Sequence, residues 1–359
     1  MASVQGLKPA GITAARKARW LPVAWGLLAM VVYAATCAPG VEWQDSGNHQ
    51  LRILTGQLEH RRGLALSHPL HYWVGRGLMR LSVGEPAYRL NLLSAACGAV
   101  GVGMLTGLVL RLTRNPLAAV LAGTGLLTAH SYWQMSVITE TYTLAAALMT
   151  IEWCLLLRYT RSGRPWLLAA LFAVNGLHVA DHLLGLLTLA TYAILLVERV
   201  ARRKLGARWL VVCAGLWVVA ASPYWTLVVH HYQGSGDVVE TLRSAFFGGG
   251  AGSRGWAQEV LNLRISSRQL ALAVLTLGYN FPTLAVPLGL FGLLRPARRR
   301  RRLFRRVLLG QTLIIGVFVG RYPIVDLYTY FVPICAPVSY THLRAHETPE
   351  HLVCRLLLE

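Results

Sequence analysis

The sequence predicts an all-α polytopic membrane protein, and three observations carry this prediction. The chain of 359 residues is 55% hydrophobic and only 14% charged, whereas soluble domains carry about a quarter charged residues. Several apolar stretches approach the roughly 20 residues that a helix needs to cross a bilayer. The basic residues, which produce a net charge of +20, lie in short clusters between these stretches, as membrane topology signals do. No basic domain gathers them, so we expect no nucleic-acid partner.

We expect about nine transmembrane helices, preceded by a cytoplasmic N-terminus of residues 1–19. An inner N-terminus places 22 of the 35 basic residues in short inner loops, as the positive-inside rule requires. The first apolar segment has no small-residue cleavage site after it, so we expect a retained anchor rather than a signal peptide. The most basic loop, residues 295–306, is interpreted as a stop-transfer loop rather than a site for DNA or anionic lipid. The nine segments are residues 20–37, 90–110, 116–138, 141–157, 166–181, 182–198, 209–229, 269–294 and 307–320.

The stretch 166–198 is predicted to be a helical hairpin, because both of its flanks are basic and should lie inside. Two long loops, residues 38–89 and 230–268, then lie outside. Within the first, residues 68–83 have the pattern of an amphipathic helix at the membrane interface. Residues 232–268 are predicted to form a flexible external loop, since their glycines lack the G-K-[ST] ending of a phosphate-binding loop.

Ionisable side chains at membrane depth are costly, and they mark candidate functional sites. Asp45 follows the first apolar segment together with Glu42 and His49, and Glu140 opens the fourth segment. Under this topology they share one outer rim with the apex of the hairpin, "NGLHVADHLL". A carboxylate at this rim could remove a proton from an acceptor hydroxyl as a general base. The polar side chains of the apex are Asn175, His178, Asp181 and His182.

Each of these residues also has a simpler interpretation. The Asp45-Ser46-Gly47 stretch is typical of a turn or a helix N-cap. Glu140 could simply stabilise the N-terminus of the helix that it precedes, through the helix dipole. The spacing of His178, Asp181 and His182 resembles that of metal ligands, although we prefer a hydrogen-bonded apex or a contact with a lipid phosphate. We therefore predict no cofactor and no metal site, with a divalent metal as the alternative that this spacing leaves open.

Six stretches, taken in order, resemble a bacterial membrane family related to the transmembrane protein O-mannosyltransferases. They are "APGVEWQDSG", "SHPLHYW", "RLNLLSAACGAV", "YWQMSVITETYTL", "NGLHVADHLL" and "DLYTYFVPI". The resemblance covers about residues 20–337 and implies a GT-C-like bundle in the bacterial inner membrane. It also implies that a sugar moves from a polyprenyl-phosphate donor to an acceptor hydroxyl on the outer face.

The resemblance also suggests roles for individual residues. Asp45 corresponds to the first-loop acid of GT-C enzymes, which is the usual catalytic base, while Glu140 and Tyr142 match their Glu-x-Tyr element. Asn175 and His182 match an Asn-His-His-like element in the fifth span. We expect these side chains to bind donor phosphate or acceptor.

The first outer loop supplies further candidates for substrate binding. His68 belongs to the stretch that corresponds to a common His-Pro motif of the family. A guanidinium suits phosphate oxygens, so outer arginines are candidates for the leaving lipid phosphate or for lipid headgroups. These arginines are Arg52, Arg61, Arg62, Arg76 and Arg80.

The end of the chain is of a different kind from the rest. Residues 338–359, "VSYTHLRAHETPEHLVCRLLLE", resemble a translated sequencing-adapter read, so we expect an artefactual tail and a natural chain that is truncated here. The main alternative function is a transporter or flippase for a lipid-linked or polar solute, and a second is a non-catalytic assembly subunit. The absence of an inverted repeat and the gathering of acids at one face favour an enzyme. The acceptor, whether protein, glycan or lipid, is not identified by the sequence.

Overall fold

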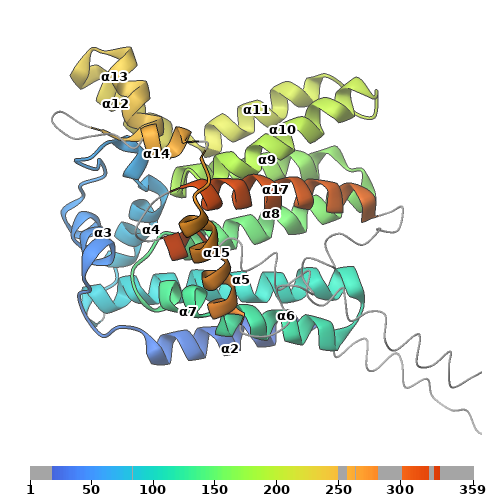
Figure 1. Ribbon diagram of the computed structural model, residues 1–359, viewed down its shortest axis with the longest axis horizontal. Helices are drawn as coiled ribbons and strands as arrows, with labels where there is room; N and C mark the ends of the chain where they lie inside the picture. Colours follow the sequence, from blue (N-terminus) through green and yellow to red (C-terminus); the bar gives the residue numbers. More distant parts are fainter. Residues whose placement is uncertain are drawn as a thin grey trace, which may run out of the picture.

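The computed structural model describes residues 18–82, 84–249, 257–262, 264–281, 301–322 and 327–331. Within these ranges every regular element is a helix, and Figure 1 shows the long helices running side by side. The predicted tail 338–359 lies outside the described residues. The elements are α2 (Leu21–Thr36), α3 (Gln44–Thr55), η1 (Leu64–Leu66), α4 (Pro69–Met79), α5 (Pro86–Thr113), α6 (Pro116–Thr128), α7 (His130–Val137), α8 (Tyr142–Ser162), α9 (Pro165–Asp181), α10 (Gly185–Ala201), α11 (Arg208–Ala220), α12 (Ser222–Ser235), α13 (Val238–Phe247), α14 (Ala257–Leu261), α15 (Ser267–Asn280), α17 (Arg302–Arg321) and η3 (Leu327–Phe331).

Two helices, α5 and α17, are each long and apolar enough to cross a bilayer. Two bent pairs, α7 with α8 and α11 with α12, meet the same criteria when each pair is counted as one span, while α2, α6 and α9 are shorter apolar helices. The structure divides the predicted segment 116–138 between α6 and α7. The prediction of one continuous helix there is wrong, because its second half begins a polar stretch whose Ser131 N–H donates to Asn280 Oδ1 at 2.8 Å.

The helices begin and pack as their sequences dictate. Proline opens α5, α6 and α9, where its missing N–H costs nothing and its fixed φ favours the first turn. Small residues let α2 and α5 approach closely: a Cβ on Gly103 would lie 2.8 Å from the Pro22 carbonyl oxygen, and Gly103 also faces Gly26. One large apolar core joins α2, α5, α6, α8, α9 and α10.

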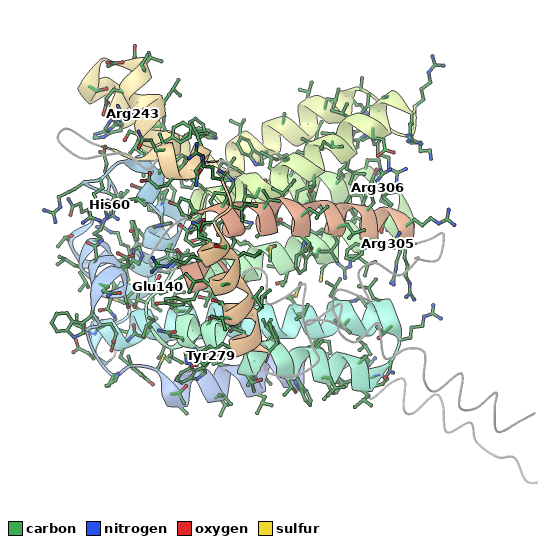
Figure 2. All side chains as sticks on the ribbon, viewed as in Figure 1. His60, Glu140, Arg243, Tyr279, Arg305 and Arg306 are labelled. Atoms are coloured by element: carbon green, nitrogen blue, oxygen red, sulfur yellow. The ribbon has the colours of Figure 1, made fainter. Side chains whose placement is uncertain are left out.

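The predicted hairpin is confirmed: α9 ends at Asp181, and α10 begins at Gly185. The arrangement also agrees with the charge-based topology, because Arg305 and Arg306 lie at the opposite end of the bundle from His60 and Arg243 (Figure 2).

Two elements that were predicted to lie outside differ from prediction. Helix α12 bends by 68° from α11 and is followed by α13. The Tyr224 hydroxyl of α12 donates a hydrogen bond to the Ala245 carbonyl of α13 at 2.6 Å. The predicted flexible loop is therefore helical over Val238–Phe247. Helix α4 forms where the amphipathic helix was predicted. It does not lie with its aliphatic face inward, because Val74 is 41% exposed while Tyr72 is fully buried.

Candidate active site

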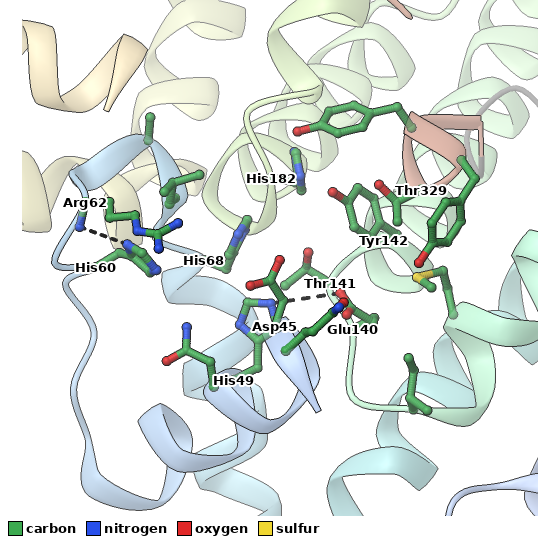
Figure 3. Close-up of a pocket in the computed structure, with 18 of the residues that line it drawn as sticks. Asp45, His49, His60, Arg62, His68, Glu140, Thr141, Tyr142, His182 and Thr329 are labelled. Atoms are coloured by element: carbon green, nitrogen blue, oxygen red, sulfur yellow. Dashed lines mark hydrogen bonds and ion pairs between the residues drawn. The ribbon is translucent and has the colours of Figure 1, made fainter. Parts of the chain in front are cut away.

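A cavity of about 510 Å³ opens where α3, the break between α7 and α8, and η3 converge. Figure 3 shows that its walls come from segments far apart in the sequence. Of the candidate residues named from the sequence, seven line it: Asp45, His49, Arg62, His68, Glu140, Tyr142 and His182. The structure thus brings together the first outer loop, the fourth predicted span and the end of the hairpin.

Asp45 is placed by the start of α3. Trp43 occupies the N-cap position and no side chain caps the helix, so the N-cap alternative for Asp45 is wrong. Asp45 instead lies in the first turn, exposed along the cavity. Gln44, immediately before it, has a left-handed φ of 57°. This conformation costs about 1–3 kcal/mol in a residue other than glycine and concentrates at functional sites.

Glu140 is placed by the break between α7 and α8, where the chain turns by 118°. Its backbone N–H donates to Ser94 Oγ at 3.0 Å, and the Ser94 hydroxyl donates to the Glu140 carbonyl at 3.2 Å. The Thr139 hydroxyl donates to Asn91 Oδ1 at 2.6 Å, and Gln50 Nε2 donates to the same oxygen at 2.9 Å. These bonds satisfy polar groups that a broken helix would otherwise leave unpaired in an apolar bundle.

A buried hydrogen-bond chain connects α3 and α4 to Glu140. Arg52 is only 3% exposed, and its guanidinium donates to the Tyr72 hydroxyl at 2.6 Å. That hydroxyl lies 2.9 Å from His49 Nδ1, and His49 Nε2 lies 3.9 Å from Glu140 Oε2. Arg52 is therefore used inside the protein, and its proposed contact with a lipid phosphate is wrong. The sequence named His49 only as a neighbour of Asp45; their spacing of four residues, which places both on one helical face, is the signal that could have linked them.

Two further histidines have defined tautomers. His68 Nδ1 lies 2.7 Å from the Asp181 carbonyl oxygen, which only accepts, so His68 carries its proton on Nδ1. His182 Nδ1 accepts from the Leu184 N–H at 3.2 Å, so its neutral form carries the proton on Nε2. Their ring centroids are 5.0 Å apart. Burial lowers the pKa of His68 well below 6.5, so His68 acts as a neutral hydrogen-bonding group.

One wall of the cavity is aromatic. The ring of Tyr142, at the start of α8, lies 5.1 Å from that of His182 and 5.7 Å from that of Tyr330 in η3. Tyr322, which follows α17, lies 5.4 Å from Tyr330 and lines the same cavity. Tyr322 and Tyr330 were not predicted as site residues, because their approach to Tyr142 depends on packing between distant helices.

Positive charge enters the cavity through Arg62. Arg62 is the only arginine among the described residues that line the cavity. Its backbone N–H donates a hydrogen bond to His60 Nδ1 at 3.0 Å, which fixes the position of its backbone. The Gly249 N–H donates to the Arg62 carbonyl at 2.6 Å. Arg76 and Arg80 are exposed on and just beyond α4, and the structure does not bring them to the cavity.

Three predicted site residues lie inside the bundle rather than on the cavity wall: Asn175, His178 and Asp181. Asn175 Nδ2 and His178 Nδ1 donate to Glu152 Oε1 at 3.1 and 2.9 Å. The backbone carbonyl of Asp181 holds His68, while its carboxylate is fully buried and has no hydrogen-bond partner among the described residues. Within those residues, no cluster of three or more His, Cys, Asp or Glu has an arrangement suited to a metal ion.

A second cavity, of about 770 Å³, lies between the first outer loop and helices α12 and α13. His231 links these elements, because its Nδ1 contacts Glu59 and its Nε2 lies 3.0 Å from Glu240 Oε2. Both ring nitrogens face carboxylates, so the ring is an imidazolium with two donors. His60 borders both cavities. Residues 57–63, here called the wall loop, thus separate them.

Comparison with known proteins defines the class. Residues 45–205 match the family model described as the protein O-mannosyl-transferase TMEM260 N-terminal domain. The fold is similar to that of ArnT from Cupriavidus metallidurans bound to undecaprenyl phosphate (TM-score 0.65, 18% identity, 95% of this chain and 61% of that chain) and to its apo state (TM-score 0.64, 18% identity, 93% and 61%). It is also similar to the arabinosyltransferase EmbB from Mycobacterium smegmatis (TM-score 0.57, 16% identity, 96% and 31%). No curated protein matches the chain.

The chain therefore has the fold of the GT-C membrane glycosyltransferases, as the sequence resemblance predicted. The similarity to the protein O-mannosyl-transferase TMEM260 N-terminal domain is confined to residues 45–205. It spans less than two thirds of the length of the ArnT chain.

Proposed function

We propose that the protein transfers a sugar from a polyprenyl-phosphate donor to an acceptor hydroxyl on the outer face of the bacterial inner membrane. The relation of residues 45–205 to protein O-mannosyl-transferases supports glycosyl transfer. The similarity to ArnT, solved with undecaprenyl phosphate, supports a polyprenyl-phosphate donor. The N-terminus is proposed to be cytoplasmic, which places the cavity on the side away from the basic loops.

The observation that carries this proposal is the meeting of Asp45 and Glu140 in one cavity at the mouth of the bundle. Asp45 is exposed there while Glu140 is only 7% exposed, so the two carboxylates have different environments. An exposed carboxylate within a cavity is accessible to a substrate hydroxyl, and acid–base catalysis requires such contact. We assign Asp45 as the general base.

The reaction follows from this geometry. The acceptor oxygen attacks the anomeric carbon while its proton passes to the Asp45 carboxylate. The bond between the anomeric carbon and the phosphate oxygen breaks, and polyprenyl phosphate leaves with the electron pair. Direct attack on the face opposite the leaving group inverts the anomeric configuration. The step needs no cofactor.

Other residues hold the donor in this scheme. The Arg62 guanidinium suits the leaving phosphate. Tyr142 and His182 present ring faces to the sugar, and His68 Nε2 accepts a hydrogen bond from a sugar hydroxyl. Arg76 and Arg80, exposed on the same side of the bundle, contact lipid headgroups.

The test uses the full-length natural protein in proteoliposomes with labelled polyprenyl-phosphate sugars. The proposal expects release of free polyprenyl phosphate together with sugar transfer to an added acceptor preparation. Movement of intact donor across the bilayer without release, for every donor tried, would identify a flippase instead and would refute glycosyl transfer.

A further inference from the structure

The hydrogen-bond chain from Arg52 to Glu140 determines where the protons lie. A guanidinium only donates, so the Tyr72 oxygen accepts from Arg52 at 2.6 Å. Arg52 is held in place by further bonds to the carbonyls of Leu58 and Gln57. The hydroxyl proton of Tyr72 is then directed to its other partner, His49 Nδ1, at 2.9 Å.

This arrangement selects one tautomer of His49. Since Nδ1 accepts from Tyr72, the proton of the neutral ring lies on Nε2, the nitrogen that faces Glu140 Oε2 at 3.9 Å. The opposite tautomer would direct a lone pair at a carboxylate, which is unfavourable. Burial, with repulsion from the nearby His71 and Arg52, lowers the pKa of His49 well below 6.5 and keeps the ring neutral.

We infer that His49 is a positioning residue, whose Nε2–H orients the Glu140 carboxylate toward substrate while Tyr72 and Arg52 hold the required tautomer. The 3.9 Å separation is longer than a hydrogen bond, as is often found for catalytic contacts before substrate is bound; the inference requires it to shorten in the complex. The inference rests on the proposed function and extends it, because it makes Glu140 a second carboxylate of fixed orientation beside the base. None of these three roles was evident in the sequence.

The chain offers a matched pair of substitutions. The amide nitrogen of glutamine falls near the position of Nε2, whereas that of asparagine falls near Nδ1. His49→Gln therefore keeps a donor toward Glu140, and His49→Asn keeps only a contact toward Tyr72. We expect His49→Gln to retain kcat within about threefold and His49→Asn to lose about 10- to 100-fold in kcat with an unchanged KM for the donor, as for loss of a hydrogen bond to a charged group.

Tyr72→Phe tests whether Tyr72 acts by selecting the tautomer of His49. It should lower kcat about tenfold when His49 is present and should have no effect in the His49→Gln protein, because glutamine has no tautomer to select. Two results would overturn the inference: an equal loss of kcat in His49→Gln and His49→Asn, or an undiminished effect of Tyr72→Phe on kcat in the His49→Gln protein. Either would show that the hydrogen-bond chain has only a structural role.

A second readout does not depend on activity. In protein labelled with ¹⁵N-histidine, the His49 signals, identified by their loss in His49→Gln, should show a protonated Nε2 and an unprotonated Nδ1. A protonated Nδ1 would overturn the inference even if the enzyme is active. If the wild-type protein releases no polyprenyl phosphate from any donor, the proposed function fails, and the nitrogen shifts alone then decide the tautomer.

Discussion

Glu152 offers the sharpest test of how the bundle is held together. Its carboxylate is fully buried in α8 and accepts hydrogen bonds from four side chains of α9 and α10. The donors and distances are Asn175 at 3.1 Å, His178 at 2.9 Å, Thr188 at 3.2 Å and Tyr192 at 3.0 Å. Interhelical hydrogen bonds in membrane proteins contribute about 0.6 kcal/mol each on average. Glu152→Ala removes four of them, so we expect a loss of about 2–3 kcal/mol in the free energy of unfolding.

Thr150 provides the matched control on the same helix. It is equally buried, but within the described part of the chain its hydroxyl bonds only to the Ala147 carbonyl of its own turn, at 2.8 Å. Thr150→Ala should therefore change stability by less than about 0.5 kcal/mol. Equilibrium unfolding in mixed micelles, followed by tryptophan fluorescence, measures both variants. A Glu152→Ala protein as stable as Thr150→Ala would refute the assignment of Glu152 as the polar centre of the bundle.

Three other predictions address the site and its surroundings. Arg62→Gln should raise the KM for the donor about tenfold or more, because Arg62 is the only arginine among the described residues of the cavity wall. Arg268→Gln, at an exposed position on α15, should leave this KM unchanged. Both KM values are measured from initial rates at increasing donor concentration. His231→Gln should increase amide hydrogen exchange in the wall loop, because one side-chain amide cannot donate well to both Glu59 and Glu240. His230→Gln, at the neighbouring exposed position, should leave this exchange unchanged. Equal exchange in the two variants would contradict the role of His231 in joining these elements. Burial lowers the pKa of His60 to about 4, so the unfolded chain binds its proton first and stability falls as the pH drops from about 6.5 toward 4. His60→Gln should flatten the dependence of the unfolding temperature on pH, and an identical slope in wild type and variant would contradict this origin.

Several features of the fold and site could be predicted from the sequence, for physical reasons. The alternation of basic loops with apolar segments reports topology directly, and this located the hairpin apex at His182 between α9 and α10. Ionisable residues at membrane depth are rare because they are costly. For that reason Asp45 and Glu140 stood out, and both line the cavity.

The remaining features depend on which surfaces meet, and the sequence does not specify that. A helical pattern shows which residues of α4 share a face, but not which face lies against the protein, so the burial of Tyr72 was missed. The link from Glu59 to His231 joins residues 172 positions apart. Asn175 and His178 share a motif with the cavity residue His182, yet they turn inward because the buried carboxylate of Glu152 requires donors.

The measurement that tests the central claim most directly compares Asp45→Asn with Glu85→Gln in the full-length protein. Glu85 is an exposed carboxylate outside both cavities, so its substitution controls for a general change in charge. With Asp45 as the base, Asp45→Asn should lower the single-turnover rate of polyprenyl phosphate release by about 10²- to 10⁴-fold, while Glu85→Gln stays near the wild-type rate. Wild-type release by Asp45→Asn would show that another group takes the proton.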